Sequence, residues 1–209
     1  MAGKKHHQSP GTKDLRMRQQ LAQEAARLIA EEGVKDFHIA KQKAALRLHA
    51  PQTHNLPRND EIQLALNEYQ RLFKSDTQPQ HLQHLRTISR EAMQFFDSFE
   101  PRLVGAVLDG SANEHSEISL HLFMDSQEEL RIFLLDQKIP FEQCSQTVRM
   151  TDRENTEIPG YRLVMRDAPV LLLVFDHKDK RQPPRCPTTG KPMQRINLKK
   201  LEELIQLAG

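Results

Sequence analysis

Three side chains capable of chemistry share one face of a short segment near the middle of the chain. Glu117, Ser119 and His121 alternate with aliphatic residues over the span 117–124. Because side chains alternate across a β-strand, this segment would present a carboxylate, a hydroxyl and an imidazole on one side and its aliphatic residues on the other. The pattern therefore indicates a place where chemistry could occur.

Glycines upstream of this segment predict the turn that positions it. Residues 102–108 favour a first strand, and Gly105 and Gly110 bound the connection to the second strand. Glycine adopts the backbone conformations that a tight turn between two strands requires. A simpler interpretation also holds, since Asp109-Gly110 is a common hairpin turn.

The first hundred residues show the periodicity of helices. Thr77 and Asn59 are residue types that cap helix N-termini, and Pro79 suits a first helical turn. The expected helices span 15–32 and 36–48, begin at Asn59 and at Thr77, and leave a loop between Pro51 and Pro57.

After Pro101 the pattern changes to short β-rich runs. Residues 170–175 are apolar throughout, which is typical of a strand buried on both faces. The expected strands are 102–108, 117–124, 141–150, 161–165 and 170–175, with a helix at 125–137, a loop at 152–159 and a last helix capped by Asn197. The predicted fold is α+β, an N-terminal helical region followed by a small mixed sheet with flanking helices. The expected parts are a disordered tail (1–14), a helical domain (15–98), an α/β domain (99–178) and a basic, proline-rich segment with a C-terminal helix (179–209).

Composition excludes several classes of protein. The chain has 209 residues, a net charge of +2 and two cysteines, which are too few for a disulfide scaffold and favour the reducing cytoplasm. No apolar run approaches the ~20 residues that span a bilayer. The basic start of the chain is not followed by an apolar core, so no secretory signal and no membrane partner are expected.

Positive charge is concentrated near the C-terminus. Eight Lys or Arg residues and one acid, Asp179, lie between Lys178 and Lys200. Such a segment is either a solvated loop or a phosphate-contacting surface. The second interpretation assigns phosphate contacts to Lys178, Arg181, Arg185 and Lys191.

Residues 104–123 resemble the signature of the nucleotidyltransferase superfamily, in which a strand, a Gly-Ser turn and a second strand bearing Asp-x-Asp follow a helix. Gly105-Ala106 falls on Gly-Ser, Gly110 on the second glycine, and Glu117-Ile118-Ser119 on Asp-x-Asp. The resemblance covers residues 80–176. It also implies a third carboxylate at the end of a later strand, for which Asp176 is the candidate.

The resemblance implies nucleotide transfer assisted by Mg²⁺, which would bridge the triphosphate and activate the acceptor oxygen. The chain departs from the family pattern because Ala106 lacks a hydroxyl, Glu117 has a longer side chain than Asp, and Ser119 replaces an acid. The implied roles are Mg²⁺ ligation by Glu117 and Asp176, assistance from the Ser119 hydroxyl or a water, and a phosphate cradle at Gly105, Ala106 and Gly110.

Two functions are consistent with these residues. The first is transfer of a nucleoside monophosphate from a nucleoside triphosphate to an acceptor that is a small molecule, an RNA or a protein. The second is a catalytically degenerate regulator or adaptor that binds a nucleotide or nucleic acid and uses the helical region as a homodimerisation surface. Residues 21–48 also resemble the first helix of TetR-type regulators, but a proline-bracketed loop follows where a DNA-recognition helix is needed.

Overall fold

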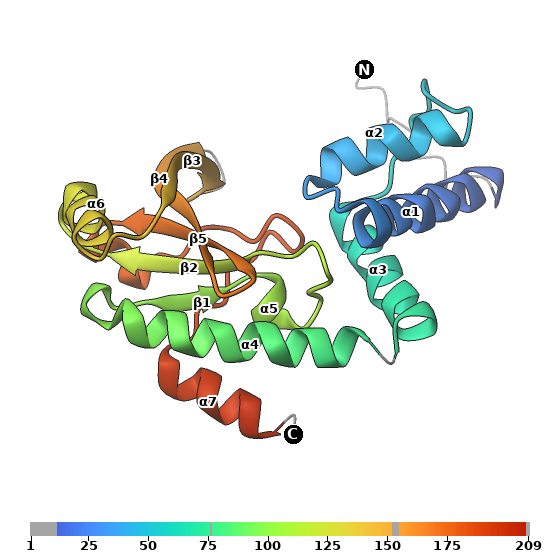
Figure 1. Ribbon diagram of the computed structural model, residues 1–209. Coiled ribbons are helices and arrows are strands. Elements are labelled where there is room, and N and C mark those ends of the chain that lie inside the picture. Colours follow the sequence, from blue (N-terminus) through green and yellow to red (C-terminus); the bar gives the residue numbers. More distant parts are fainter. Residues whose placement is uncertain (1–11, 76, 152–154, 208–209) are drawn as a thin grey trace, which may run out of the picture. The chain divides into compact units, whose positions relative to one another are not determined.

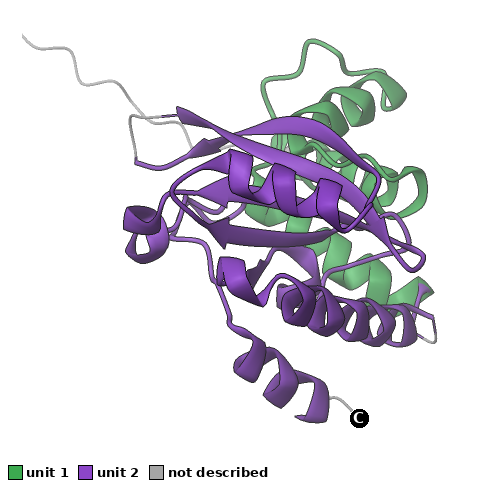
Figure 2. Cartoon of the chain, turned by 60° about the vertical axis from the view of Figure 1, so that its left-hand side comes forward, with its two compact units in different colours: residues 1–73 green, residues 74–209 purple. Residues whose placement is uncertain are grey.

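The computed structural model describes residues 12–75, 77–151 and 155–207. The chain divides into two compact units, residues 1–73 and residues 74–209 (Figure 2). Within the described ranges it forms seven α-helices and one five-stranded mixed sheet, which confirms the α+β class. The tail expected over residues 1–14 lies outside the described residues except for its end, where the first helix already begins at Thr12.

Unit 1 consists of three helices, α1 (Thr12–Glu32), α2 (Phe37–Arg47) and α3 (Asn59–Phe73). The carboxylate of Asp36 caps α2 by accepting a hydrogen bond from the N–H of Ile39, which satisfies one of the unpaired amides of the first turn. Leucine, isoleucine and alanine side chains at helical spacing form its core, among them Leu21, Ala25, Leu28, Ala40, Ala44 and Ile62.

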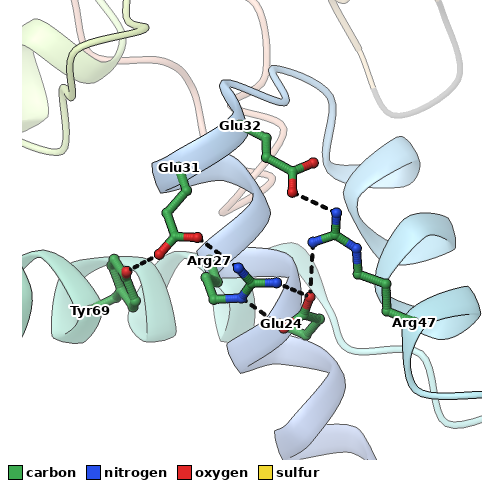
Figure 3. A network of polar contacts seen from close by, with 6 residues as sticks. All are labelled: Glu24, Arg27, Glu31, Glu32, Arg47 and Tyr69. Atoms are coloured by element: carbon green, nitrogen blue, oxygen red, sulfur yellow. Dashed lines mark hydrogen bonds and ion pairs between the residues drawn. The ribbon is translucent and has the colours of Figure 1, made fainter.

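A network of polar side chains joins α1 to the other two helices of unit 1 (Figure 3). Arg47 on α2 contacts two carboxylates of α1, and the hydroxyl of Tyr69 on α3 donates to a third. Ion pairs at such exposed positions are weak because water screens them, so the network fixes the positions of the helices more than it adds stability. Its members are Glu24, Arg27, Glu31, Glu32, Arg47 and Tyr69.

The described helices of unit 1 differ from those of a DNA-reading domain in charge and in connection. The first turn of α3 carries Asp60 and Glu61, and the last turn carries Arg71, so its charge is mixed. A recognition helix instead places basic and polar side chains toward the bases and phosphates. An eleven-residue connection, residues 48–58, separates α2 from α3 and replaces the short turn of a helix-turn-helix.

Unit 2 begins with α4 (Gln78–Phe95) and the 3₁₀ turn η1 (Asp97–Phe99) and ends with α7 (Leu198–Leu207). Its sheet has the order β1-β2-β5-β4-β3, with β2 and β5 parallel and every other pair antiparallel (Figure 1). The remaining elements are β1 (Arg102–Val104), α5 (Ala106–Asp109), β2 (Ile118–Phe123), α6 (Gln127–Asp136), β3 (Phe141–Arg149), β4 (Asn155–Met165), β5 (Ala168–Phe175) and the 3₁₀ turn η2 (His177–Arg181).

The two faces of the sheet are built differently. Even-numbered residues of β2 and β5, such as Leu120 and Leu172, belong to the main core together with residues of α4, α6 and α7. We call this the inner face. Odd-numbered residues of the same strands point to the outer face, where Phe123, Leu171 and Phe175 belong to a separate apolar cluster. The alternation expected from the sequence therefore assigns Glu117, Ser119 and His121 to the outer face.

The structure differs from the sequence expectations at three boundaries. The helical domain was expected to reach residue 98, but α4 packs its apolar side into the core of the sheet unit, so the division follows Phe73. The first strand ends at Val104 rather than at residue 108, because Gly105 turns the backbone (φ +73°) into α5. The expected loop 152–159 contains the start of β4, where Pro159 is tolerated because β5 pairs with β4 only from Gly160 onward.

Candidate functional site

The glycine turn and Glu117 lie at the same end of the sheet. The antiparallel register pairs Val104 with Ser119, so Gly105 follows at the level of Ile118, directly beside Glu117. Gly105 has φ +73° and ψ −153°, a conformation that favours glycine. A Cβ placed on Gly105 would meet nothing within 4 Å, so the backbone here borders open space. The phosphate-binding role of this turn stays a prediction.

Glu117 faces a cation that the sequence analysis did not consider. The Nε atom of Arg162, on β4, lies 3.7 Å from Oε2 of Glu117. The side chain of Glu117 is 16% exposed and that of Arg162 is 45% exposed. A partly exposed pair of this kind is weak, on the order of 1 kcal/mol or less. The guanidinium of Arg162 therefore remains available to a competing anion.

Asp176 lies at the opposite end of the sheet from Glu117. The parallel register places Ile118 beside Val170 and Phe123 beside Phe175, so Asp176 follows the far end of this strand pair. Seven residues of strand, at about 3.3 Å each, separate the Cα atoms of Glu117 and Asp176 by roughly 23 Å along the strands, farther than the two side chains can bridge. A Mg²⁺ ion binds its ligands at about 2.1 Å. The prediction that Glu117 and Asp176 share Mg²⁺ is therefore wrong.

The residues beside Glu117 do not fit the magnesium site of a nucleotidyltransferase. On β5, the position next to Ser119 is occupied by Leu171, which is 3% exposed and part of the outer apolar cluster. The ligand set on this face is one carboxylate, already paired with Arg162, and one hydroxyl. Across the part of the chain that the structure describes, no group of three His, Cys, Asp or Glu side chains is arranged to hold a metal ion.

His121 shares the outer face with Glu117 and Ser119 but is closed off from solvent, at 1% exposed. Its Nδ1 accepts a hydrogen bond from Nε of Arg195 at 2.9 Å, which places the imidazole proton on Nε2. Burial, and then the charge of Arg195, hold the pKa of His121 well below its usual range. His121 is thus a neutral structural acceptor and not a ligand or a general base.

Low pH should destabilise the protein through His121. The unfolded chain takes up a proton near pH 6.5, whereas the folded chain resists protonation, so stability present above this pH is lost as the pH falls. The expected loss approaches about 1.4 kcal/mol per pH unit. In His121→Asn, Oδ1 of the asparagine can replace Nδ1 as the acceptor, and no imidazole titrates. Between pH 6.5 and 5 we expect the free energy of unfolding of this variant to fall by up to ~2 kcal/mol less than that of the wild-type chain.

Urea unfolding at a series of pH values measures this difference. His177→Asn serves as the control, because His177 is largely exposed at the start of η2. It should follow the pH dependence of the wild-type chain. Equal pH dependence of the wild-type and His121→Asn chains would contradict the assignment.

The basic segment folds over the outer face, away from the glycine turn. We call residues 176–197 the strap. The guanidinium of Arg195 lies over Phe123 and Phe175, 5.0 and 4.8 Å from their ring centroids. Arg185 donates its backbone N–H to the carbonyl of Arg149 at the end of β3.

The four residues assigned to phosphate therefore stand apart from Gly105. Lys178 and Arg181 belong to η2 beyond the end of β5, and Arg185 and Lys191 belong to a turn next to the end of β3. Lys178 pairs with Asp176 at 2.7 Å, and Lys180 pairs with Glu100. These contacts and the burial of Arg195 leave the strap a weaker phosphate-binding surface than its composition indicates.

Arg162 is the site residue that the sequence analysis missed. It stands between Tyr161 and Leu163, both buried, in a strand that was recognised. A lone charge between two buried residues marks the opposite face of a strand. That signal places Arg162 on the outer face but does not show that Glu117 lies opposite.

Within the described residues, no helix combines the length and apolar character that crossing a membrane requires. No protein-family model and no curated protein matches the chain.

Proposed function

We propose that unit 2 is a catalytically reduced domain of the nucleotidyltransferase type, which binds a nucleoside phosphate and does not transfer the nucleotide. The observation that carries this proposal is the placement of the Gly105 turn, Glu117 and Arg162 at one end of the sheet. Gly105 follows β1 and Arg162 lies on β4, three strand spacings or about 14 Å apart, and Glu117 lies between them. The strand order around the turn supports the type of fold. The distance of Asp176 from this end supports the loss of transfer chemistry.

The donors at this end of the sheet suit the extended phosphate chain of a nucleotide without a metal ion. The guanidinium of Arg162 can bind phosphate oxygens in a bidentate manner, and the Ser119 hydroxyl and the open backbone at Gly105 offer further hydrogen bonds. Nucleotidyl transfer in this superfamily instead requires carboxylates that hold Mg²⁺ against the reacting phosphate. Here the one carboxylate beside the turn faces the guanidinium.

Calorimetric titration of the full-length chain with ATP and GTP tests this proposal. We expect binding of equal affinity in EDTA and in Mg²⁺. Arg162→Gln should weaken it at least tenfold, because a hydrogen bond to a charged group contributes about 1.5–3 kcal/mol. Glu117→Gln should strengthen binding severalfold, because it removes a negative charge that competes for Arg162. An assay with α-labelled triphosphate should show no transfer.

Arg149→Gln is the matched control, since Arg149 is an exposed arginine at the far end of β3. It should bind nucleotide as the wild-type chain does. The sign of the Glu117→Gln effect separates the two hypotheses. If binding requires Mg²⁺ and Glu117→Gln abolishes it, the site is metal-dependent and our proposal fails. The proposal would also be overturned if neither ATP nor GTP bound at millimolar concentration.

A further inference from the structure

The topology of unit 2 creates a crevice at the end of the sheet opposite the glycine turn. Strands β2 and β5 are parallel neighbours, so both end at the same edge. After β2 the chain passes to α6, whose Leu130 and Leu134 join the core on the inner face. After β5 the chain passes into the strap, which covers the outer face through Arg195. Adjacent parallel strands whose continuations diverge to opposite faces leave a crevice where α/β proteins commonly bind ligands.

A cleft of about 440 Å³ occupies this position. That volume lies within the usual range of small-molecule sites, about 300–1,000 Å³. Residues 124–127 line one side and residues 176–182 line the other, as the divergence of the two chain segments requires. The apolar lining comes from Met124, Met150, Ile158, Pro159, Val174 and Phe175.

The charged lining of the cleft is predominantly acidic. It includes the carboxylates of Asp125, Glu157, Asp176 and Asp179 and one ammonium group, that of Lys178. Lys178 pairs with Asp176 at 2.7 Å. Asp179 is attracted to the charge of Arg195. Among the ion pairs of the described residues, none neutralises Asp125 or Glu157. Glu157 accepts a hydrogen bond from the Ser145 hydroxyl on β3, a neutral donor that leaves its charge in place.

We propose that this cleft binds a small organic cation, an amine or guanidine attached to an apolar body. The apolar side chains would accept the body of the ligand, and the carboxylates of Asp125 and Glu157 would accept its charged group. A free anion is disfavoured, because four carboxylates surround the cleft. The proposal is independent of phosphate binding at Gly105, since the two sites lie at opposite ends of β2.

Two methionines in the cleft allow a direct test in the full-length chain. With methyl-¹³C methionine labelling, titration with 4-phenylbutylamine should shift the methyl signals of Met124 and Met150. The signal of Met93, which lies on α4 in the main core, should stay in place and serves as the internal control. The carboxylate of similar shape, 4-phenylbutyrate, should give no shifts at the same concentrations.

A charge-removing variant then tests the role of the carboxylates. Asp125→Asn combined with Glu157→Gln should weaken binding of the amine at least tenfold. Asp136→Asn, at the exposed end of α6, should leave binding unchanged, and so should Arg162→Gln. The proposal would be overturned if the amine and the carboxylate bound equally well, or if the double variant bound the amine as the wild-type chain does. It would also be overturned if neither methyl signal shifted at 10 mM amine, a concentration on the order of the weakest fragment affinities.

Discussion

Gly160→Ala should destabilise unit 2 by about 3 kcal/mol, at the upper end of the usual cost of overpacking. A Cβ atom on Gly160 would lie 2.5 Å from the carbonyl oxygen of Leu172 and 2.9 Å from Cδ2 of Leu173. The closer contact is with backbone in β5, which has strands on both sides. A side chain could rotate away, but the backbone of an interior strand can move only by disturbing its hydrogen bonds to β2 or β4.

Urea unfolding followed by circular dichroism measures the effect of this substitution. Val164→Ala is the matched control, because Val164 lies on the same strand and the same face but is 65% exposed. Its cost should be within about 0.5 kcal/mol. If the Gly160→Ala and Val164→Ala chains unfold at the same urea concentration, the close approach of β4 and β5 does not require glycine.

The local features of unit 2 follow from the sequence because they depend on neighbouring residues. Alternation in residues 117–123 predicts which side chains share a face, and the apolar run at 170–175 predicts a buried strand. Gly105 predicts the turn, since its positive φ is accessible to glycine without strain. Each of these inferences needs only the chemistry of a few adjacent positions.

The candidate metal site could not be predicted in the same way, because it depended on the direction of one strand. Asp176 does follow the end of a strand, as the sequence analysis expected, and that strand lies next to β2. In an antiparallel pair, the end of β5 would lie beside the beginning of β2 and thus beside Glu117. The pair is parallel, so Asp176 lies beside the end of β2 instead. Periodicity carries no information about strand direction or order.

The position of α4 illustrates a similar limit. Its apolar stripe predicts a helix with one buried side, and the structure confirms a helix at residues 78–95. The same stripe would suit packing against other helices or against a sheet. Leu85, Ile88 and Met93 pack in the core of the sheet unit, so α4 belongs to unit 2 and not to the unit of the preceding helices.

Arg195→Ala should have the second large effect, a loss of about 3 kcal/mol in the stability of unit 2. The truncation removes the guanidinium from the rings of Phe123 and Phe175 and its hydrogen bonds to His121 Nδ1 and the carbonyl of Asp179. Each desolvated cation–π contact contributes up to about 2 kcal/mol. A buried acceptor left without a donor, here Nδ1 of His121, costs a further ~1–3 kcal/mol.

The cost of burying the guanidinium opposes the stabilisation that these cation–π contacts and hydrogen bonds provide. It lowers the pKa of Arg195 to about 10, and Nη2 is enclosed without a hydrogen-bond partner in the described structure. Arg195→Met separates the two contributions, because a methionine keeps apolar contact with the rings and lacks the charge. We expect the stability of Arg195→Met to lie between the stabilities of the wild-type and Arg195→Ala chains. The control Lys199→Ala, on an exposed helix surface, should be as stable as the wild-type chain.

Amide hydrogen exchange distinguishes a local from a global effect of Arg195. The amides of Asp179, Gln182 and Ile196 donate hydrogen bonds that depend on the position of the strap. If Arg195 holds the strap to the outer face, Arg195→Ala should increase the exchange rates of these amides by a larger factor than the exchange rates of the β5 amides. Arg195→Met should show an intermediate increase. A methionine variant more stable than the wild-type chain would mean that desolvation of the guanidinium outweighs its contacts with Phe123, Phe175 and His121.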